Sequence, residues 1–165
     1  MEPEVVADYS DHLGENPLWH AAERQVYWED YTRGRLLRFN PESNAHEVLY
    51  EGKKIGGFTI QSDGSLLLFM EKGTIARLSQ GELSYIVKEI PNEDQSHFND
   101  VVADPKGRVF CGTVPDSEPD RNNWSGRLYR LDTDGSITIV LEGIGCSNGM
   151  GFTQDRKGMY YTDSL

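Results

Sequence analysis

A candidate catalytic motif lies near the end of the chain, where residues 145–149 read GCSNG. The pattern G-x-S-x-G presents a nucleophilic serine when a strand precedes it, a helix follows it and a histidine comes later in the chain. The residues after Ser147 are rich in glycine and show a strand pattern, and His97 is the last histidine. A nucleotide-binding G-x-G-x-x-G loop is excluded as well, because Asn148 stands where its third glycine belongs. Ser147 is therefore not expected to be a nucleophile, and Asn148 becomes the residue of interest.

Oxygen-bearing side chains stand at the start of several apolar segments, among them Glu15, Asn99 and Asn148. Carboxylate and carboxamide oxygens that converge on one point form a site suited to Ca²⁺, Mg²⁺ or Mn²⁺. Such an ion can polarise a carbonyl or phosphoryl group and lower the pKa of a bound water molecule. Each residue alone would more often form an Asx turn or cap a strand. The chemistry therefore depends on whether the fold brings the three together.

The chain repeats one design four times. Each copy is a short apolar run, a polar turn and a second apolar run, which is typical of a β-hairpin. These hairpins begin near residues 16, 57, 99 and 148, and the first three are followed by two more alternating strands. Four antiparallel strands that recur about every 40 to 50 residues predict the blades of a β-propeller. A two-sheet sandwich is the alternative, but it does not predict a motif at this spacing.

Repeat position predicts where the candidate residues lie. In a propeller the first strand of each blade lines a central channel, and the starts of these strands meet at one mouth. Asn148 is expected at the same repeat position as Asn16, Gly57 and Asn99. Glu15, Asn99 and Asn148 would then face one another across the channel.

Composition narrows the class of partner. The chain suits one all-β domain over residues 1–165, and it carries 27 acidic against 16 basic side chains, a net charge of −11. A chain this acidic would repel nucleic acid and anionic membranes. It shows no leader pattern and no apolar stretch of about 20 residues, so we expect a soluble, cytoplasmic protein without membrane contact. Cys111 and Cys146 could form a disulfide only if the fold brought them together.

Three segments together resemble a known family. Residues 14–30, 97–113 and 147–164 read GENPLWHAAERQVYWED, HFNDVVADPKGRVFCGT and SNGMGFTQDRKGMYYTDS. They are similar to three successive blade motifs of the senescence marker protein, gluconolactonase and luciferin-regenerating enzyme-like family, also called the regucalcin type. The resemblance implies a six-bladed propeller with one divalent metal ion, Ca²⁺, Zn²⁺, Mn²⁺ or Mg²⁺, in its channel. This chain would cover roughly the first three and a half to four of those blades.

The resemblance also implies roles for four residues. Glu15 and Asn148 would be metal ligands, and Asn99 would be a catalytic residue that contacts the substrate. His97 stands where the family has an arginine that helps to hold the sugar. His97 would therefore bind substrate and tune specificity together with the 115–125 loop, and the substrate need not be an aldonolactone.

The chain ends inside the fourth predicted blade. The family's acidic ligand and general base, an aspartate, would accordingly come from beyond Leu165, whereas Asp163 is expected to be only a polar strand end. Exposed edges of an open propeller invite pairing with a second chain. We expect self-association through these edges, and an isolated chain that is poorly stable or at least inactive. A cooperative melt together with full lactonase turnover by the purified monomer would contradict the latter expectation.

These features predict a metal-dependent hydrolase of the gluconolactonase type, in which the metal ion polarises the ester carbonyl of a sugar lactone and activates water. Two alternatives use the same scaffold: a non-catalytic propeller that binds Ca²⁺ or a protein partner, and a phosphotriesterase-like hydrolase with the same metal site. The loop 115–125 is either a lid over the site or a solvated polar loop. Its candidate substrate contacts are Asp116, Glu118, Arg121 and Trp124. Aromatic residues of the repeated strands are expected to pack between blades.

Overall fold

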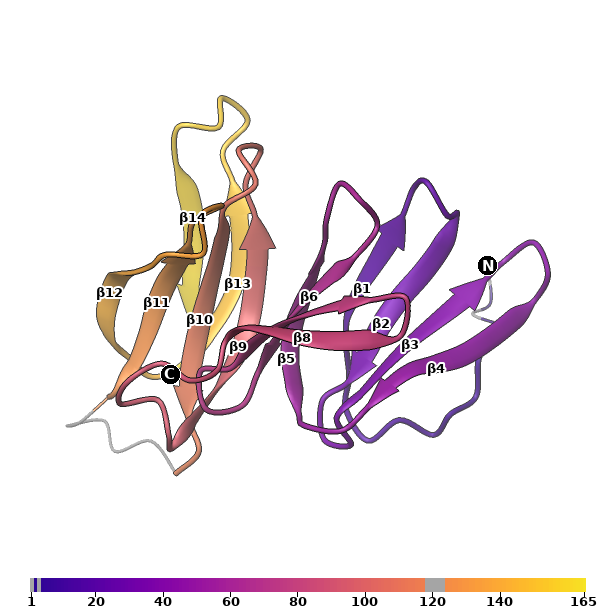
Figure 1. The fold of residues 1–165 in the computed structure, drawn as a ribbon, viewed down its shortest axis with the longest axis horizontal. Helices are drawn as coiled ribbons and strands as arrows, with labels where there is room; N and C mark the ends of the chain where they lie inside the picture. The colour runs from indigo at the N-terminus through magenta and orange to yellow at the C-terminus, as the bar shows by residue number, and fades with distance from the viewer. Residues whose placement is uncertain (1, 3, 118–123) are drawn as a thin grey trace. The chain divides into compact units, whose positions relative to one another are not determined.

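The computed structural model describes residue 2, residues 4–117 and residues 124–165, and these contain fourteen strands (Figure 1). No helix long and apolar enough to cross a membrane occurs in this described part of the chain. In chain order the strands are β1 (Gly14–His20), β2 (Gln25–Asp30), β3 (Arg35–Asn40), β4 (Ala45–Glu51), β5 (Ile55–Ile60), β6 (Leu66–Met70), β7 (Ile75–Ser79), β8 (Glu82–Val87), β9 (Ser96–Ala103), β10 (Val109–Pro115), β11 (Gly126–Leu131), β12 (Ile137–Ile144), β13 (Ser147–Phe152) and β14 (Met159–Asp163).

The strands form four sheets, each with neighbours in chain order. Strands β1 to β4, β5 to β8 and β9 to β12 make three sheets of four strands, and β13 pairs with β14. This arrangement confirms the all-β class and the four-stranded antiparallel repeat. The chain divides into two compact units, residues 1–55 and 56–165. The single domain expected over the whole chain stays a prediction.

Each hairpin at the start of a repeat turns through a residue with positive φ. These residues are Arg24, Gly64, Gly107 and Arg156, with φ of 55°, 83°, 80° and 56°. Such left-handed conformations allow the tight reversal between paired strands. The repeated polar turns of the sequence therefore become the repeated hairpin turns of the structure.

The core of the second unit lies between two of its four-stranded sheets. Phe69 of β6 packs edge-to-face on Phe98 of β9 with ring centroids 5.4 Å apart, and Phe98 in turn contacts Tyr129 of β11 at 6.5 Å. Aromatic packing between repeats is confirmed for the Phe69–Phe98 pair. Trp19 of β1 and Tyr160 of β14 are 54% and 75% exposed, so packing between blades stays a prediction for these two residues.

The strand pairing corrects the predicted repeat register by one residue. Glu15 pairs with Glu29 of β2, and Asn148 pairs with Thr162 of β14. In both hairpins a β-bulge follows directly after the pair. Glu15, and not Asn16, is therefore the structural equivalent of Asn148.

The β-bulge explains why the register predicted from the repeats differs from the register of the strand pairing. In the third sheet Phe98 pairs with Thr113, and the bulge that follows contains Asn99. Asn99 thus corresponds to Asn16 and Gly149, which occupy the bulges of the other two hairpins with φ of 50° and 37°. A bulge adds a residue without changing the apolar pattern on either side of it, so alignment of the repeats by sequence can miss it.

Candidate functional site

The first strands of three sheets meet in the second unit. The side-chain nitrogen Nδ2 of Asn99 on β9 donates a hydrogen bond of 2.7 Å to the main-chain oxygen of Ser147 at the start of β13. Figure 1 shows β9 and β13 beside each other. The structure therefore brings together the two segments that carry Asn99 and Asn148, as the repeat predicts.

Two glycines permit this close approach. A Cβ atom on Gly112 of β10 would lie 1.7 Å from the Ser147 hydroxyl oxygen, and one on Gly56 of β5 would lie 1.5 Å from the Phe98 carbonyl oxygen. Neither position has room for any side chain. The start of β9 consequently lies within contact distance of both β5 and β13.

Ser147 itself is fully buried, and its hydroxyl makes no hydrogen bond within the described part of the chain. The hydroxyl of Tyr161, also buried there without such a bond, lies near it. Burial raises the pKa of Tyr161, an effect that the neighbouring Ser147 partly offsets. Because a strand follows Ser147 and no histidine contacts its hydroxyl among the described residues, the nucleophile motif is matched only in its letters.

Asn148 is exposed, and its main chain is held from both sides. Its side-chain oxygen accepts a hydrogen bond of 3.1 Å from the amide of Gly149. Upstream, the carboxylate of Asp163 accepts hydrogen bonds from the amides of Gly145 at 3.0 Å and Cys146 at 2.8 Å. Asp163 is thus engaged with main chain, which accords with a structural role at the end of its strand.

His97 lies two residues before Asn99 and has an acidic partner. Its Nδ1 atom is 2.7 Å from a carboxylate oxygen of Asp116, and its side chain is 15% exposed. The main chain of His97 also pairs with that of Glu71, which follows β6, in an isolated antiparallel β-bridge. The start of the 115–125 loop is therefore tied to the segment that carries Asn99.

The loop also returns to the Asn148 segment. The ring of Trp124 lies 3.1 Å from the position of a Cβ atom on Gly145, so Trp124 packs against the residues that precede β13. Glu118 and Arg121, the other two loop residues proposed from sequence, lie outside the described residues.

Glu15 belongs to the first unit, where it is exposed on β1. The bulge residue next to it, Asn16, donates from its side chain to Glu29 at 3.2 Å. Asp30, the last residue of β2, accepts hydrogen bonds from the amides of His12 and Leu13, just before β1. The main chain on both sides of Glu15 is therefore anchored to β2, while its carboxylate projects into solvent.

The donor chemistry fits a hard divalent cation. Glu15 offers a carboxylate and Asn148 a carboxamide oxygen, both exposed, and such oxygens suit Ca²⁺, Mg²⁺ and Mn²⁺. No group of three or more His, Cys, Asp or Glu side chains that could hold a metal ion is found within residues 4–117 and 124–165. Each of the two residues thus offers an exposed oxygen donor, and a metal site shared by them stays a prediction.

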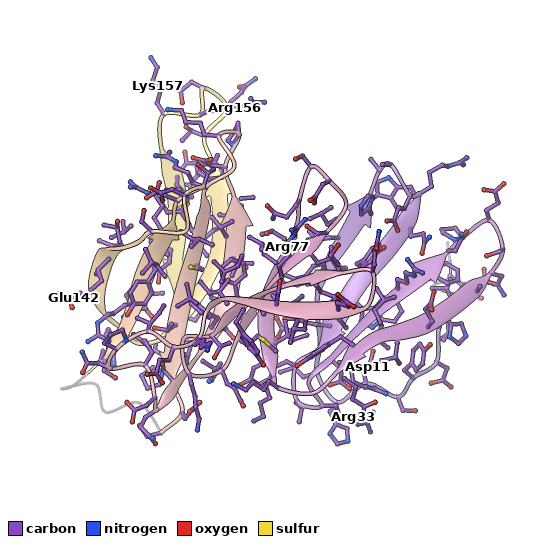
Figure 2. All side chains as sticks on the ribbon, viewed as in Figure 1. Asp11, Arg33, Arg77, Glu142, Arg156 and Lys157 are labelled. Atoms are coloured by element: carbon purple, nitrogen blue, oxygen red, sulfur yellow. The ribbon has the colours of Figure 1, made fainter. Side chains whose placement is uncertain are left out.

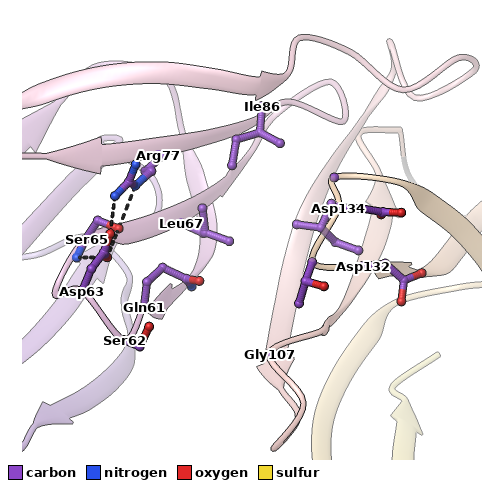
Figure 3. Close-up of a pocket in the computed structure, with 13 residues that line it drawn as sticks. Gln61, Ser62, Asp63, Ser65, Leu67, Arg77, Ile86, Gly107, Asp132 and Asp134 are labelled. Atoms are coloured by element: carbon purple, nitrogen blue, oxygen red, sulfur yellow. Dashed lines mark hydrogen bonds and ion pairs between the residues drawn. The ribbon is translucent and has the colours of Figure 1, made fainter.

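A pocket of about 480 Å³ lies elsewhere in the second unit, among hairpin turns (Figure 3). Its carboxylates already have partners. Asp63 binds the side chain of Arg77, and Asp134 accepts a 2.9 Å hydrogen bond from the amide of Ser136. None of the residues proposed from sequence lines this pocket, so we assign it no part in the site.

No disulfide joins the two cysteines. Cys111 is buried in β10, and Cys146 is partly exposed before β13. Burial raises the pKa of the Cys111 thiol. The disulfide left open by the sequence is therefore not formed.

Known proteins resemble this chain over most of its length. Residues 13–165 match the family described as the SMP-30/gluconolactonase/LRE-like region. The chain is 47% identical over 159 residues to a pentonolactonase from Haloferax volcanii, with 96% of this chain and 52% of that protein covered. It is 31% identical over 153 residues to a 6-deoxy-6-sulfogluconolactonase from Pseudomonas putida, with 92% and 52% covered. The chain spans about half the length of the curated relatives it matches.

The fold has a counterpart among solved structures. A calcium-binding protein, regucalcin, from Agrobacterium tumefaciens has a TM-score of 0.83 to this chain at 20% sequence identity, over 92% of this chain and 50% of that one. Similarity at this level of identity shows the fold. It confirms the β-propeller architecture built of four-stranded antiparallel blades.

Proposed function

The chain belongs to the SMP-30/gluconolactonase/LRE-like family, and from this premise we propose that it acts in the divalent-metal-dependent hydrolysis of sugar lactones. The observation that carries the proposal is the 47% identity to a pentonolactonase over 159 residues. The meeting of Asn99 with the Ser147–Asn148 segment supports it from the structure. We further propose that the four sheets are successive blades of one domain.

Glu15 and Asn148 are the proposed metal ligands. Both are exposed, both contribute oxygen, and both occupy the position just before the bulge of a first strand. When bound, a divalent ion polarises the lactone carbonyl and acidifies water for attack on it. The part of this chain is to hold the two oxygens in place, because their orientation decides where the substrate carbonyl can lie.

Asn99 is the proposed substrate contact. Its Nδ2 atom is committed to the Ser147 carbonyl, which fixes the plane of the carboxamide. Its oxygen accepts no hydrogen bond within the described part of the chain, so it can accept one from a sugar hydroxyl. Asn99 would thereby orient the ring relative to the metal ligand that follows Ser147.

His97 is proposed to contribute to specificity. The bond to Asp116 holds the imidazole in one orientation, two residues from Asn99. An imidazole is shorter than the arginine found at this place in the family and cannot form a two-pronged contact. We therefore propose a lactone whose substituents differ from those of gluconolactone, and the 47% identity to a pentonolactonase makes a pentonolactone the first candidate.

The proposal is tested on the purified chain in two steps. Metal analysis and thermal melting with added Ca²⁺, Mn²⁺ and Zn²⁺ should reveal a bound ion and an increase in Tm. A pH-drop assay on pentonolactones and hexonolactones also tests the expectation that the isolated chain is inactive. If the unchanged chain shows turnover, that turnover should fall at least tenfold in Glu15→Gln. Glu42→Gln, an exposed change in the same unit, serves as the matched control.

Two results would overturn it. One is the absence of any bound ion together with no effect of added metal on Tm. The other is measurable lactone turnover that is equal in Glu15→Gln, Glu42→Gln and the unchanged chain.

A further inference from the structure

Asp30 makes a specific three-bond contact with the residues that precede β1. Its Oδ2 atom accepts a hydrogen bond from the amide of His12 at 3.3 Å, and its Oδ1 atom accepts one from the amide of Leu13 at 3.4 Å. The next amide along, that of Tyr31, donates to the Leu13 carbonyl at 3.0 Å. The end of β2 thereby clamps two consecutive peptide units.

Asp163 makes the same contact at the other candidate ligand. Its Oδ2 atom accepts from the amide of Gly145 at 3.0 Å, and its Oδ1 atom accepts from the amide of Cys146 at 2.8 Å. The following amide, that of Ser164, donates to the Cys146 carbonyl at 3.0 Å. The three hydrogen bonds at Asp163 therefore match those at Asp30 one by one: each carboxylate oxygen accepts from one of two consecutive amides, and the amide that follows the aspartate donates to the carbonyl of the second.

The second clamped residue of each pair has the same separation in sequence from the proposed metal ligand that follows it. Leu13 is two residues before Glu15, and Cys146 is two residues before Asn148. The blade that carries Asn99 has a different arrangement.

Strand pairing shows which residues take the equivalent places in that blade. Thr113 pairs with Phe98 as Thr162 pairs with Asn148, so Val114 corresponds to Asp163. Valine has no carboxylate, and the next residue, Pro115, has no amide hydrogen to donate. The three-bond contact therefore occurs in the two hairpins that present a proposed ligand, and it is chemically impossible in the one that presents Asn99.

We propose that Asp30 and Asp163 are positioning residues that set the orientation of Glu15 and Asn148 toward the metal ion. This inference rests on the proposed function, because it concerns the same site. A carboxylate that accepts two neighbouring amides holds them more firmly than a neutral acceptor does. The two peptide units are thereby ordered before metal binds, which lowers the entropic cost of gathering the ligands.

The experiment measures Mn²⁺ affinity by calorimetry with the metal alone. Asp163→Ala should weaken Mn²⁺ binding about tenfold or more, which corresponds to about 1.4 kcal/mol. Asp163→Asn keeps one acceptor oxygen, so it should lose less. The matched control is Asp155→Ala, which removes hydrogen bonds to Thr153 and Lys157 at the far end of the same hairpin. Figure 2 labels Arg156 and Lys157, the two residues that follow Asp155, at that far tip of the hairpin.

A second readout does not depend on metal. Amide hydrogen exchange at Gly145 and Cys146 should accelerate in Asp163→Ala and stay unchanged in Asp155→Ala, since only Asp163 accepts from those amides. If Asp163→Ala fails to fold, Asp163→Asn and Asp30→Asn carry the same two measurements.

Asn148→Ala separates failure of this inference from failure of the proposed site. If Asn148→Ala weakens Mn²⁺ binding and a folded Asp163→Ala does not, the positioning role is refuted and the site stands. If Asn148→Ala binds Mn²⁺ like the unchanged chain, the proposed site is refuted, and the positioning role is refuted with it. Loss of affinity in both variants, with Asp155→Ala unaffected, supports the inference.

Discussion

The carboxamide nitrogen of Asn99 lies 2.7 Å from the main-chain oxygen of Ser147, 48 residues further along the chain. One end of this contact is the bulge residue of β9, and the other is the residue just before Asn148. The side chain proposed to contact the substrate and the main chain proposed to present a metal ligand are thus joined directly. A change at Asn99 is expected to disturb both.

Asn99→Ala should lower stability and turnover together. Loss of the hydrogen bond to Ser147 should reduce the free energy of unfolding by about 1 kcal/mol, as measured by urea denaturation. Turnover of a pentonolactone should fall by about tenfold or more, because the substrate also loses an acceptor. Gln95→Ala removes a nearby exposed carboxamide that, within the described residues, donates hydrogen bonds to its neighbour Asp94 alone, and it should change neither quantity. Equal turnover in the two variants would exclude Asn99 from the site.

Ser147→Ala should leave lactone turnover within about twofold of the unchanged chain, and it should keep or slightly raise Tm. The hydroxyl is buried and makes no hydrogen bond of good geometry within residues 4–117 and 124–165, so its removal abolishes a desolvation cost and, besides that, only the interaction with the neighbouring Tyr161 hydroxyl. Turnover and melting of this variant measure the two effects. A loss of activity of a hundredfold or so, with the fold intact, would instead restore Ser147 as a nucleophile.

The repeat pattern was enough to predict the sheets and the strands that meet. Its limit is seen at Asn16, which the apolar pattern aligns with Asn148 although strand pairing places Glu15 there. Sequence periodicity reports which face a side chain occupies, whereas a bulge shifts the register within a strand by one residue. Only the hydrogen-bond ladder reveals that shift.

The anchoring carboxylates were missed for a related reason. Asp30 and Asp163 end equivalent strands, in the segments VYWED and MYYTD, so a signal was present in the repeat. A strand-end aspartate is common as a polar cap, and its type alone does not identify the amides that it accepts. The buried Glu93 had no repeat signal, because its partners Arg127 and Tyr129 are distant in sequence.

Glu93 and Glu142 should differ greatly in their contribution to stability, although both bind Arg127. Glu93 is buried and accepts from Arg127 at 2.8 Å and from the Tyr129 hydroxyl at 2.6 Å, whereas the side chain of Glu142 is 66% exposed. Figure 2 shows Glu142 at the outer edge of its sheet. Glu93→Ala should cost about 3 kcal/mol, because the buried hydroxyls of Tyr129 and Ser96 and the partly buried guanidinium of Arg127 lose an acceptor, and Glu142→Ala about 0–1 kcal/mol. Similar unfolding midpoints in urea for the two variants would contradict this assignment.

Asp30 should make stability depend on pH in the acid range. Burial alone would raise the pKa of its carboxyl, but hydrogen bonds from Arg35 and from the amides of His12, Leu13 and Arg33 outweigh burial, so the pKa lies below its ordinary value. The ionised form therefore favours the folded state. Its contribution is complete above the unfolded pKa, about 3.9, and is lost as the pH falls through the lower folded value.

The measurement is the urea midpoint of Asp30→Asn and of the unchanged chain at pH 7, 5 and 3. Asp30→Asn should be less stable by about 1–3 kcal/mol at pH 7 and pH 5, since a charged acceptor is lost, and the difference should narrow at pH 3. Glu42→Gln, an exposed change in the same unit, should track the unchanged chain at every pH. A difference that stays constant from pH 7 to pH 3, or widens, would show that the charge of Asp30 does not stabilise the residues before Glu15.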